Sequence, residues 1–82
     1  MKIQVRLSVP AVSGQFDVLI PTFQTPGVLA GLLAKAVEDV TDHLYIASGS
    51  ELLCRLEDKR VLNSAETIAA LGIKNGDHLI LI

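Results

Sequence analysis

The sequence predicts an α+β protein in which one amphipathic helix packs across a mixed sheet of four to five strands. Alternating apolar and polar residues near both ends of the chain indicate strands, and a single apolar stripe near the middle indicates the helix. The length of 82 residues allows one compact domain and excludes an enzyme with a cleft between two lobes. We therefore treat residues 1–82 as a single domain.

The N-terminal residues predict an antiparallel hairpin. Residues 3–9 alternate apolar and polar side chains, which is the period of a strand with one buried face. Pro10 ends this run, and residues 16–20 repeat the alternation after a turn at 13–14. The second strand places Leu19 on the face that meets solvent.

A helix is predicted after the hairpin, because Thr25 can act as an N-cap and Pro26 suits the first helical position. The apolar stripe expected to face the sheet consists of Leu29, Leu32, Leu33, Ala36, Val37 and Val40. The opposite side would present Gly27, Gly31 and Ala34, whose small side chains would let another helix approach closely. This second candidate face has an equally good explanation in neutral sequence drift.

Residues 41–50 leave three interpretations open. Leu44, Tyr45 and Ile46 could finish the helix, plug the bottom of the core or form a short strand. We treat the segment as a connection that ends at Gly49.

A third strand is predicted at residues 52–56, with alternate residues on opposite faces. The residues expected to face the core are Leu52, Cys54 and Leu56, and those expected to face solvent are Leu53 and Arg55. We interpret Cys54 as a buried core thiol, because a nucleophilic cysteine needs a neighbouring cation or a helix N-terminus and free cysteine is usually buried.

Two further strands complete the sheet. The charged cluster at 57–60 predicts a turn into a short fourth strand at 61–62. A tight turn at 75–77 leads to the last strand at 78–82, which is the most apolar and therefore belongs in the middle of the sheet.

A short helix is predicted between these two strands. Asn63 and Glu66 have the spacing of a capping box for a helix from Ser64 to about Ala70, and Gly72 can provide a left-handed stop. The complete order of strand, strand, helix, strand, strand, short helix and strand is the arrangement of a β-grasp domain.

Composition argues against several classes of function. With 7 Lys and Arg, 9 Asp and Glu and a net charge of −2, the chain has no basic stripe that would follow a nucleic acid. Its single cysteine excludes an intramolecular disulfide and fits a reducing compartment. No stretch is long and apolar enough to enter a membrane, so we expect a cytoplasmic protein.

The sequence contains no recognisable catalytic constellation. His43 and His78 lack the clustered partners of a metal site, and Asp17 and Asp77 are more typical of turns and solvated edges than of acid and base pairs. The glycines do not form a phosphate-binding loop. We therefore expect no enzyme activity, no catalytic or metal-binding residue and no cofactor.

Three segments carry a resemblance to a known family: the second strand at 16–21, the Thr25-Pro26 start of the helix, and the ending at 71–82, which joins a Gly-Asp turn to an apolar strand. In these features the chain resembles the YukD/EsaB family of ubiquitin-like proteins, which is associated with bacterial type VII (ESX/WXG100) secretion. The resemblance implies a ubiquitin-like fold and a small cytoplasmic accessory or regulatory component of the secretion apparatus.

The resemblance also implies the kind of partner. We expect cytoplasmic domains of membrane components of the machinery, which would hold the protein peripherally at the inner face of the membrane. In actinobacterial systems a similar domain begins a multi-pass membrane subunit, whereas no membrane segment follows Ile82 here, which favours a free-standing form. Covalent conjugation is not expected, because the C-terminal Gly-Gly that ubiquitin and sulfur carriers use is missing.

Other interpretations remain open. The chain could be a small ubiquitin-fold subunit of a multicomponent enzyme such as a bacterial monooxygenase. A longer natural C-terminus ending in Gly-Gly would instead indicate a sulfur or ubiquitin-type carrier.

The candidate binding surface follows from strand parity on the face of the sheet away from the helix. Its expected members are Leu53, Ile80 and Ile82, with Arg55 and Arg6 as a basic rim and Leu19 farther out. Ubiquitin's main recognition surface is likewise aliphatic and basic-rimmed on this face. A protein partner or a homodimer could therefore occupy it.

Overall fold

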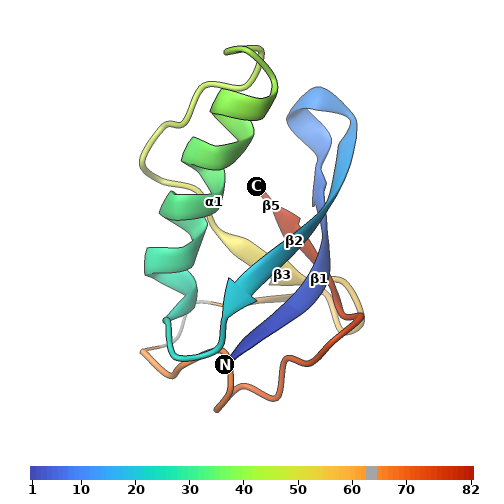
Figure 1. Ribbon diagram of the computed structural model, residues 1–82, viewed down its shortest axis with the longest axis vertical. Coiled ribbons are helices and arrows are strands. Elements are labelled where there is room, and N and C mark those ends of the chain that lie inside the picture. The colour runs from blue at the N-terminus through green and yellow to red at the C-terminus, as the bar shows by residue number, and fades with distance from the viewer. Residues whose placement is uncertain (63–64) are drawn as a thin grey trace.

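The computed structural model describes residues 1–62 and 65–82. A five-stranded mixed sheet has helix α1 packed across one face (Figure 1). The elements are β1 (Lys2–Val9), the short 3₁₀ helix η1 (Pro10–Val12), β2 (Gly14–Pro21), α1 (Pro26–Val40), β3 (Leu53–Arg55), β4 (Arg60–Val61) and β5 (His78–Leu81). The strand order β2-β1-β5-β3-β4 confirms the ubiquitin-like β-grasp fold with the last strand in the middle. Strand β5 runs parallel to β1 and antiparallel to β3.

The alternation predicted for the hairpin and for the last strand is confirmed. On β1 the side chains of Val5 and Leu7 are buried, and on β5 those of Leu79 and Leu81 are at most 1% exposed. These residues face α1 and form the centre of the core. Leu19 is 65% exposed, as its position on the other face predicts.

Helix α1 is rotated relative to the predicted stripe. Leu29, Leu33 and Val37 are buried as predicted, but Leu32 is 55% and Val40 70% exposed, and Ala36 is exposed as well. The remaining buried positions belong to Pro26, Ala30 and Ala34. Small alanine side chains let the helix backbone approach the β3 side of the sheet closely, so the contact strip shifts toward them.

Ala34 is consequently not on the outer side of the helix, and that prediction is wrong because its side chain is fully buried. Thr25 is the N-cap residue, but its side chain makes no capping hydrogen bond; instead its backbone carbonyl accepts from the amide of Leu29. The helix start therefore depends mainly on Pro26, which follows the N-cap.

Of the three interpretations of residues 41–50, the structure selects the core plug. Tyr45 is 8% exposed and belongs to the core, whereas Leu44 and Ile46 are exposed. The Thr41 hydroxyl donates to the Val37 carbonyl and accepts from the Tyr45 amide, so the chain turns back directly after the helix.

The parity predicted for β3 is wrong. Leu53 is 0% exposed and lies opposite Leu81, so it belongs to the core and cannot contribute to an exposed patch. Cys54 is half-buried and lies opposite Ile80, on the face away from α1, so it is not a core thiol. Pairing with β5 fixes this parity, because residues directly opposite each other in a ladder share one face.

The segment before β5 forms hydrogen-bonded turns in place of the predicted short helix. The amides of Ile68 and Ala69 donate to the carbonyls of Gln24 and Thr22, so they are unavailable for helical bonds. Gly72 has a φ of +77°, which confirms its left-handed conformation. The proposed capping box begins at Asn63, which with Ser64 lies outside the described residues.

Candidate interaction surface

The face of the sheet away from α1, here called the open face, carries apolar side chains over β3, β4 and β5. Leu52 and Ile82 exchange two backbone hydrogen bonds of 2.8 and 2.9 Å and so lie directly opposite each other. Cys54 lies opposite both Ile80 and Val61. With Leu56, whose amide donates to the His78 carbonyl, these residues form what we call the aliphatic patch: Leu52, Cys54, Leu56, Val61, Ile80 and Ile82.

The structure keeps part of the predicted set together. Ile82 is 57% exposed and Ile80 half-buried, both on the open face as predicted. Arg6 lies on the same face, opposite both His78 and Asp17. Leu19 is exposed but separated from Ile80 by strand β1, so it borders the open face without joining the patch.

Arg55 is not part of the rim, and that prediction is wrong. It lies opposite Leu79, and its Nη2 donates to the Leu71 carbonyl over 2.6 Å. Its Nη1 is 3.9 Å from the Asp58 carboxylate, and its Nε is buried without a hydrogen-bond partner among the described residues. Arg55 therefore joins β3 to the segment before β5 and is a structural residue.

Sequence reasoning missed four members of the patch. Leu52, Cys54, Leu56 and Val61 are 38–42% exposed or half-buried on the open face. The alternation of 52, 54 and 56 was visible, but it predicts only that these residues share a face. Their orientation follows from the pairing with β5, because the register of a short strand is set by the strand beside it.

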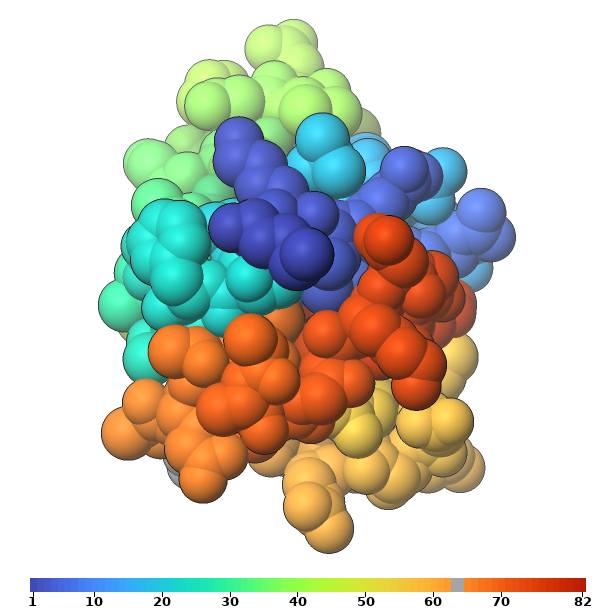
Figure 2. Space-filling model, turned by 60° about the horizontal axis from the view of Figure 1, so that its bottom comes forward, coloured from blue at the N-terminus to red at the C-terminus, as the bar shows by residue number. Residues whose placement is uncertain are grey.

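The other half of the open face is polar. The Arg6 Nε is 3.4 Å from the Asp17 carboxylate, and the Ser8 hydroxyl is 2.6 Å from the His78 Nε2. Gln4 binds the loop before β5 through its backbone amide, which donates to Asn75 Oδ1 over 2.8 Å. Figure 2 shows the N-terminal part of the chain and the segment before β5 side by side at this end of the molecule.

A depression of about 590 Å³ lies on this polar half. Its lining residues are Gln4, Val5, Arg6, Asp17, Asn75, Gly76 and His78. Since His78 and Ile80 are on the same strand and the same face, the depression adjoins the aliphatic patch.

The predicted helix face is reduced to two glycines. A Cβ added at Gly27 or Gly31 would meet no atom within 4 Å, so both positions face open space. Leu32 and Val40 are also exposed on α1, but nine residues separate Gly31 from Val40 and place these two on opposite sides of the helix. Val40 also borders an apolar groove of about 150 Å³ between α1 and β2.

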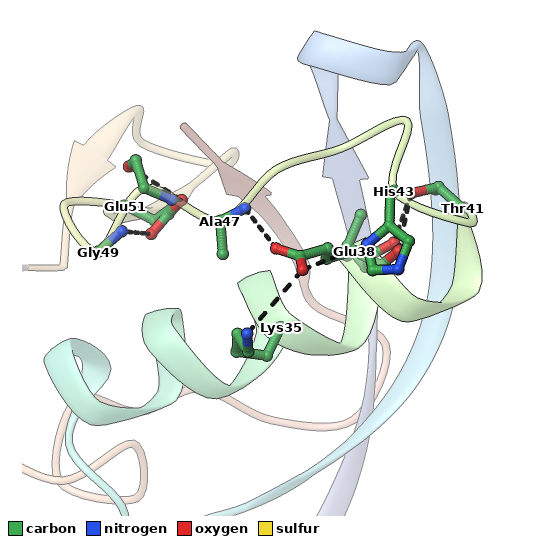
Figure 3. A network of polar contacts seen from close by, with 9 residues as sticks. Lys35, Glu38, Thr41, His43, Ala47, Gly49 and Glu51 are labelled. Carbon is green, nitrogen blue, oxygen red and sulfur yellow. Dashed lines mark hydrogen bonds and ion pairs between the residues drawn. The ribbon is translucent and has the colours of Figure 1, made fainter.

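Two carboxyl groups with lowered pKa values lie away from the open face, one in the last turns of α1 and one in the loop after it (Figure 3). Glu51 accepts hydrogen bonds from the backbone amides of Ser48 and Gly49 and from the Tyr45 hydroxyl. The bonds from Ser48 lower the pKa of Glu51 from 4.5 to about 2. Glu38 accepts from the Ala47 amide over 2.8 Å, which lowers its pKa. These carboxylates shape the loop.

The described residues contain neither a cluster of three His, Cys, Asp or Glu side chains suited to a metal nor a helix long and apolar enough to cross a membrane. The groups on the open face are apolar side chains, the Cys54 thiol, the Arg6 guanidinium beside the Asp17 carboxylate, and the His78 imidazole. The fold and this surface together define a ubiquitin-like protein.

The chain belongs to the YukD family, described as "WXG100 protein secretion system (Wss), protein YukD", which matches residues 4–81. It is thus a ubiquitin-like component or domain of the type VII (WXG100) secretion machinery. The family is not known to contain enzymes. Comparison with curated proteins gives no significant match.

Solved structures support the fold. The EccD5 ubiquitin-like domain from Mycobacterium xenopi has a TM-score of 0.82 and 18% identity, with 100% of this chain and 93% of that chain covered. A chain of the MycP5-free ESX-5 inner membrane complex has a TM-score of 0.82 and 21% identity over 99% of this chain and 20% of its own length. The UBL domain of Plasmodium falciparum Dsk2 has a TM-score of 0.69 and 21% identity, with 100% of both chains covered.

Proposed function

We propose that this protein is a non-enzymatic interaction module, an accessory or regulatory component that docks through its open face onto a cytoplasmic domain of the secretion machinery. One observation carries the proposal: a member of a secretion family has six apolar residues, each at least partly exposed, gathered on one sheet face. Scattered apolar side chains are normal on a protein surface, but a contiguous group is typical of a contact site.

The patch leaves apolar surface that a partner could cover. Four of its members, Leu52, Leu56, Val61 and Ile82, are between 38% and 57% exposed. The partner would cover these side chains, and burial of apolar surface contributes about 25 cal/mol per Å² before the costs of association are subtracted. A central apolar group with a polar surround is the usual anatomy of a protein interface.

The likeness to a chain of an ESX-5 inner membrane complex supports a partner within the membrane machinery. On this proposal residues 1–82 act as one domain in the cytoplasm, held at the inner face of the membrane by that partner and requiring no cofactor. The family assignment favours this function over the alternative of a small subunit of a multicomponent enzyme.

The test is affinity capture from a lysate that contains the membranes of a bacterium with a WXG100 secretion system. Wild-type protein should retain subunits of the secretion machinery, identified by mass spectrometry, and Ile80→Glu should lose them because a charge enters the centre of the patch. Ile82→Glu repeats the test at a more exposed position, in case the first variant folds poorly.

Val40→Glu is the matched control, since it adds the same charge at a 70% exposed apolar residue on the helix. It should retain the machinery subunits. Retention by both patch variants would refute docking through the open face. Light scattering of the free proteins distinguishes the competing homodimer, in which Ile82→Glu would convert a dimer to a monomer.

A further inference from the structure

The charges of this acidic protein are unevenly distributed. Acidic residues gather at the end of α1 and in the loop after it, where Glu38, Asp39, Asp42 and Glu51 outnumber Lys35. The open face instead carries cations on β1: Lys2 and Arg6 alternate with Gln4 on the face away from the core. Asp17 on β2 faces the same way and pairs with Arg6, so Lys2, Arg6 and Asp17 together leave one net positive charge beside the apolar surface.

The depression on the open face is lined by hydrogen-bond donors that the protein does not use. Arg6 contacts Asp17 only through Nε, over 3.4 Å, and neither Nη atom has a partner among the described residues. The pair is half exposed, 54% for Arg6 and 55% for Asp17, so it holds the guanidinium weakly and leaves its outer edge available.

The neighbouring side chains add to this set. His78 is bonded through Nε2 to Ser8. With the Ser8 hydroxyl as the donor of this bond, Nδ1 carries the ring proton, and it has no partner within the described part of the chain. Asn75 uses its Oδ1 to accept from the Gln4 amide, which leaves its NH₂ group to donate. Asp77, the residue before His78, is turned into its own loop, where it accepts from the Lys74 backbone amide.

We propose, as an inference that rests on the proposed function, that the open face recognises an acidic aliphatic segment of its protein partner. Apolar side chains of this segment cover the aliphatic patch. A carboxylate of the same segment enters the depression and accepts hydrogen bonds from Arg6, Asn75 and His78. A guanidinium edge suits the two oxygens of a carboxylate, and bonds between charged partners are the stronger ones.

Spacing favours a single segment that makes both contacts. His78 and Ile80 are two residues apart on β5 and point to the same face, which places them about 7 Å from each other. An extended partner segment with an aliphatic and an acidic side chain at every second position repeats this spacing. Of two partner side chains that are two residues apart, the aliphatic one would therefore contact the patch and the acidic one the depression.

The experiment is a titration of the ¹⁵N-labelled full chain with a capped peptide in which leucine and glutamate alternate at every second position with serine between them. The matched peptide carries glutamine in place of glutamate. The glutamate peptide should shift the amide signals of residues 4–6, 75–78 and 80, and the glutamine peptide should bind about tenfold more weakly, the cost of losing one charged hydrogen bond.

Variants of the protein sharpen the result. Arg6→Gln should weaken binding of the glutamate peptide about tenfold and remove the difference between the two peptides. Arg60→Gln, at an exposed residue on the outer strand β4, should change neither. Equal binding of both peptides, binding by neither, or shifts confined to the groove between α1 and β2 would overturn the proposal.

These results separate the two proposals. If the glutamine peptide binds as well as the glutamate peptide while capture of the machinery still depends on Ile80 and Ile82, the acidic partner is wrong and the docking face stands. If the glutamate peptide binds as expected while patch variants still capture the machinery, the recognition stands and the proposed function is wrong.

Discussion

The two faces of β3 and β5 differ completely although the same seven residues supply both. On the core face Leu53, Leu79 and Leu81 are at most 1% exposed. On the open face Cys54, next to Leu53, and Ile80, between Leu79 and Leu81, are only half-buried. The comparison shows that alternate residues of one strand can supply the core and an exposed apolar surface separately; on the proposed function the second of these is the docking surface.

The largest expected effect comes from adjacent substitutions on β3. Leu53→Ala should lower the free energy of unfolding by about 2–5 kcal/mol, because it leaves a cavity in the core. Cys54→Ala should lower it by less than about 1 kcal/mol, since the thiol is half-buried on the open face. Urea unfolding of both variants measures the difference, and a loss for Cys54→Ala as large as or larger than that for Leu53→Ala would contradict the assigned parity of β3.

The two arginines provide a second comparison. Arg55→Ala should cost about 1–3 kcal/mol, because it removes the 2.6 Å hydrogen bond to the Leu71 carbonyl and the packing of a half-buried side chain. Arg6→Ala should cost less than about 1 kcal/mol, since its ion pair is exposed. Thermal unfolding of the two variants tests this, and a larger loss for Arg6 would contradict the assignment of roles.

The outer side of α1 belongs to neither face of the sheet. Gly31→Ala should raise the free energy of unfolding by about 0.5–1 kcal/mol, because the added methyl group meets open space and alanine favours the helix. Gly72→Ala is the control and should be destabilising, since its φ is +77°. A stable Gly31→Ala variant that no longer captured the secretion machinery would restore this side of the helix as a contact site.

The smallest effect concerns pH. The folded state lowers the pKa of Glu51 from 4.5 to about 2, so its stabilising contribution is present above pH 4.5 and is lost as the pH falls through this window to 2. Solvent screening keeps the contribution small. Glu51→Gln should flatten this part of the stability profile, measured by unfolding between pH 2 and 6. A profile as steep as that of wild type would assign the effect to other carboxylates.

The sequence predicts the fold well because its strongest patterns are long. Eight residues of β1 alternate without interruption, and the helix stripe spans three turns. The β3 strand has only three residues, and leucines at 52, 53 and 56 are compatible with either parity. Only long-range pairing with β5 decides between them, and that information is not local.

The candidate site, like the fold, could be predicted only where the strand pattern is regular. Ile80 and Ile82 were oriented by the regular pattern of the last strand, whereas Leu53 and Arg55 followed the wrong parity of the third. The burial of Arg55 depends on the carbonyl of Leu71, sixteen residues away, which no local pattern reveals. The patch found in the structure therefore shares the place in the fold of the predicted one but only part of its membership.

The most direct test of the central claim, that the open face carries the function separately from the core, is WXG100 substrate secretion by a bacterium whose own copy is replaced with Ile82→Glu. We predict that secretion is lost while the variant accumulates to wild-type levels and keeps the unfolding temperature of the wild-type protein. Normal secretion by this stable variant would contradict the account.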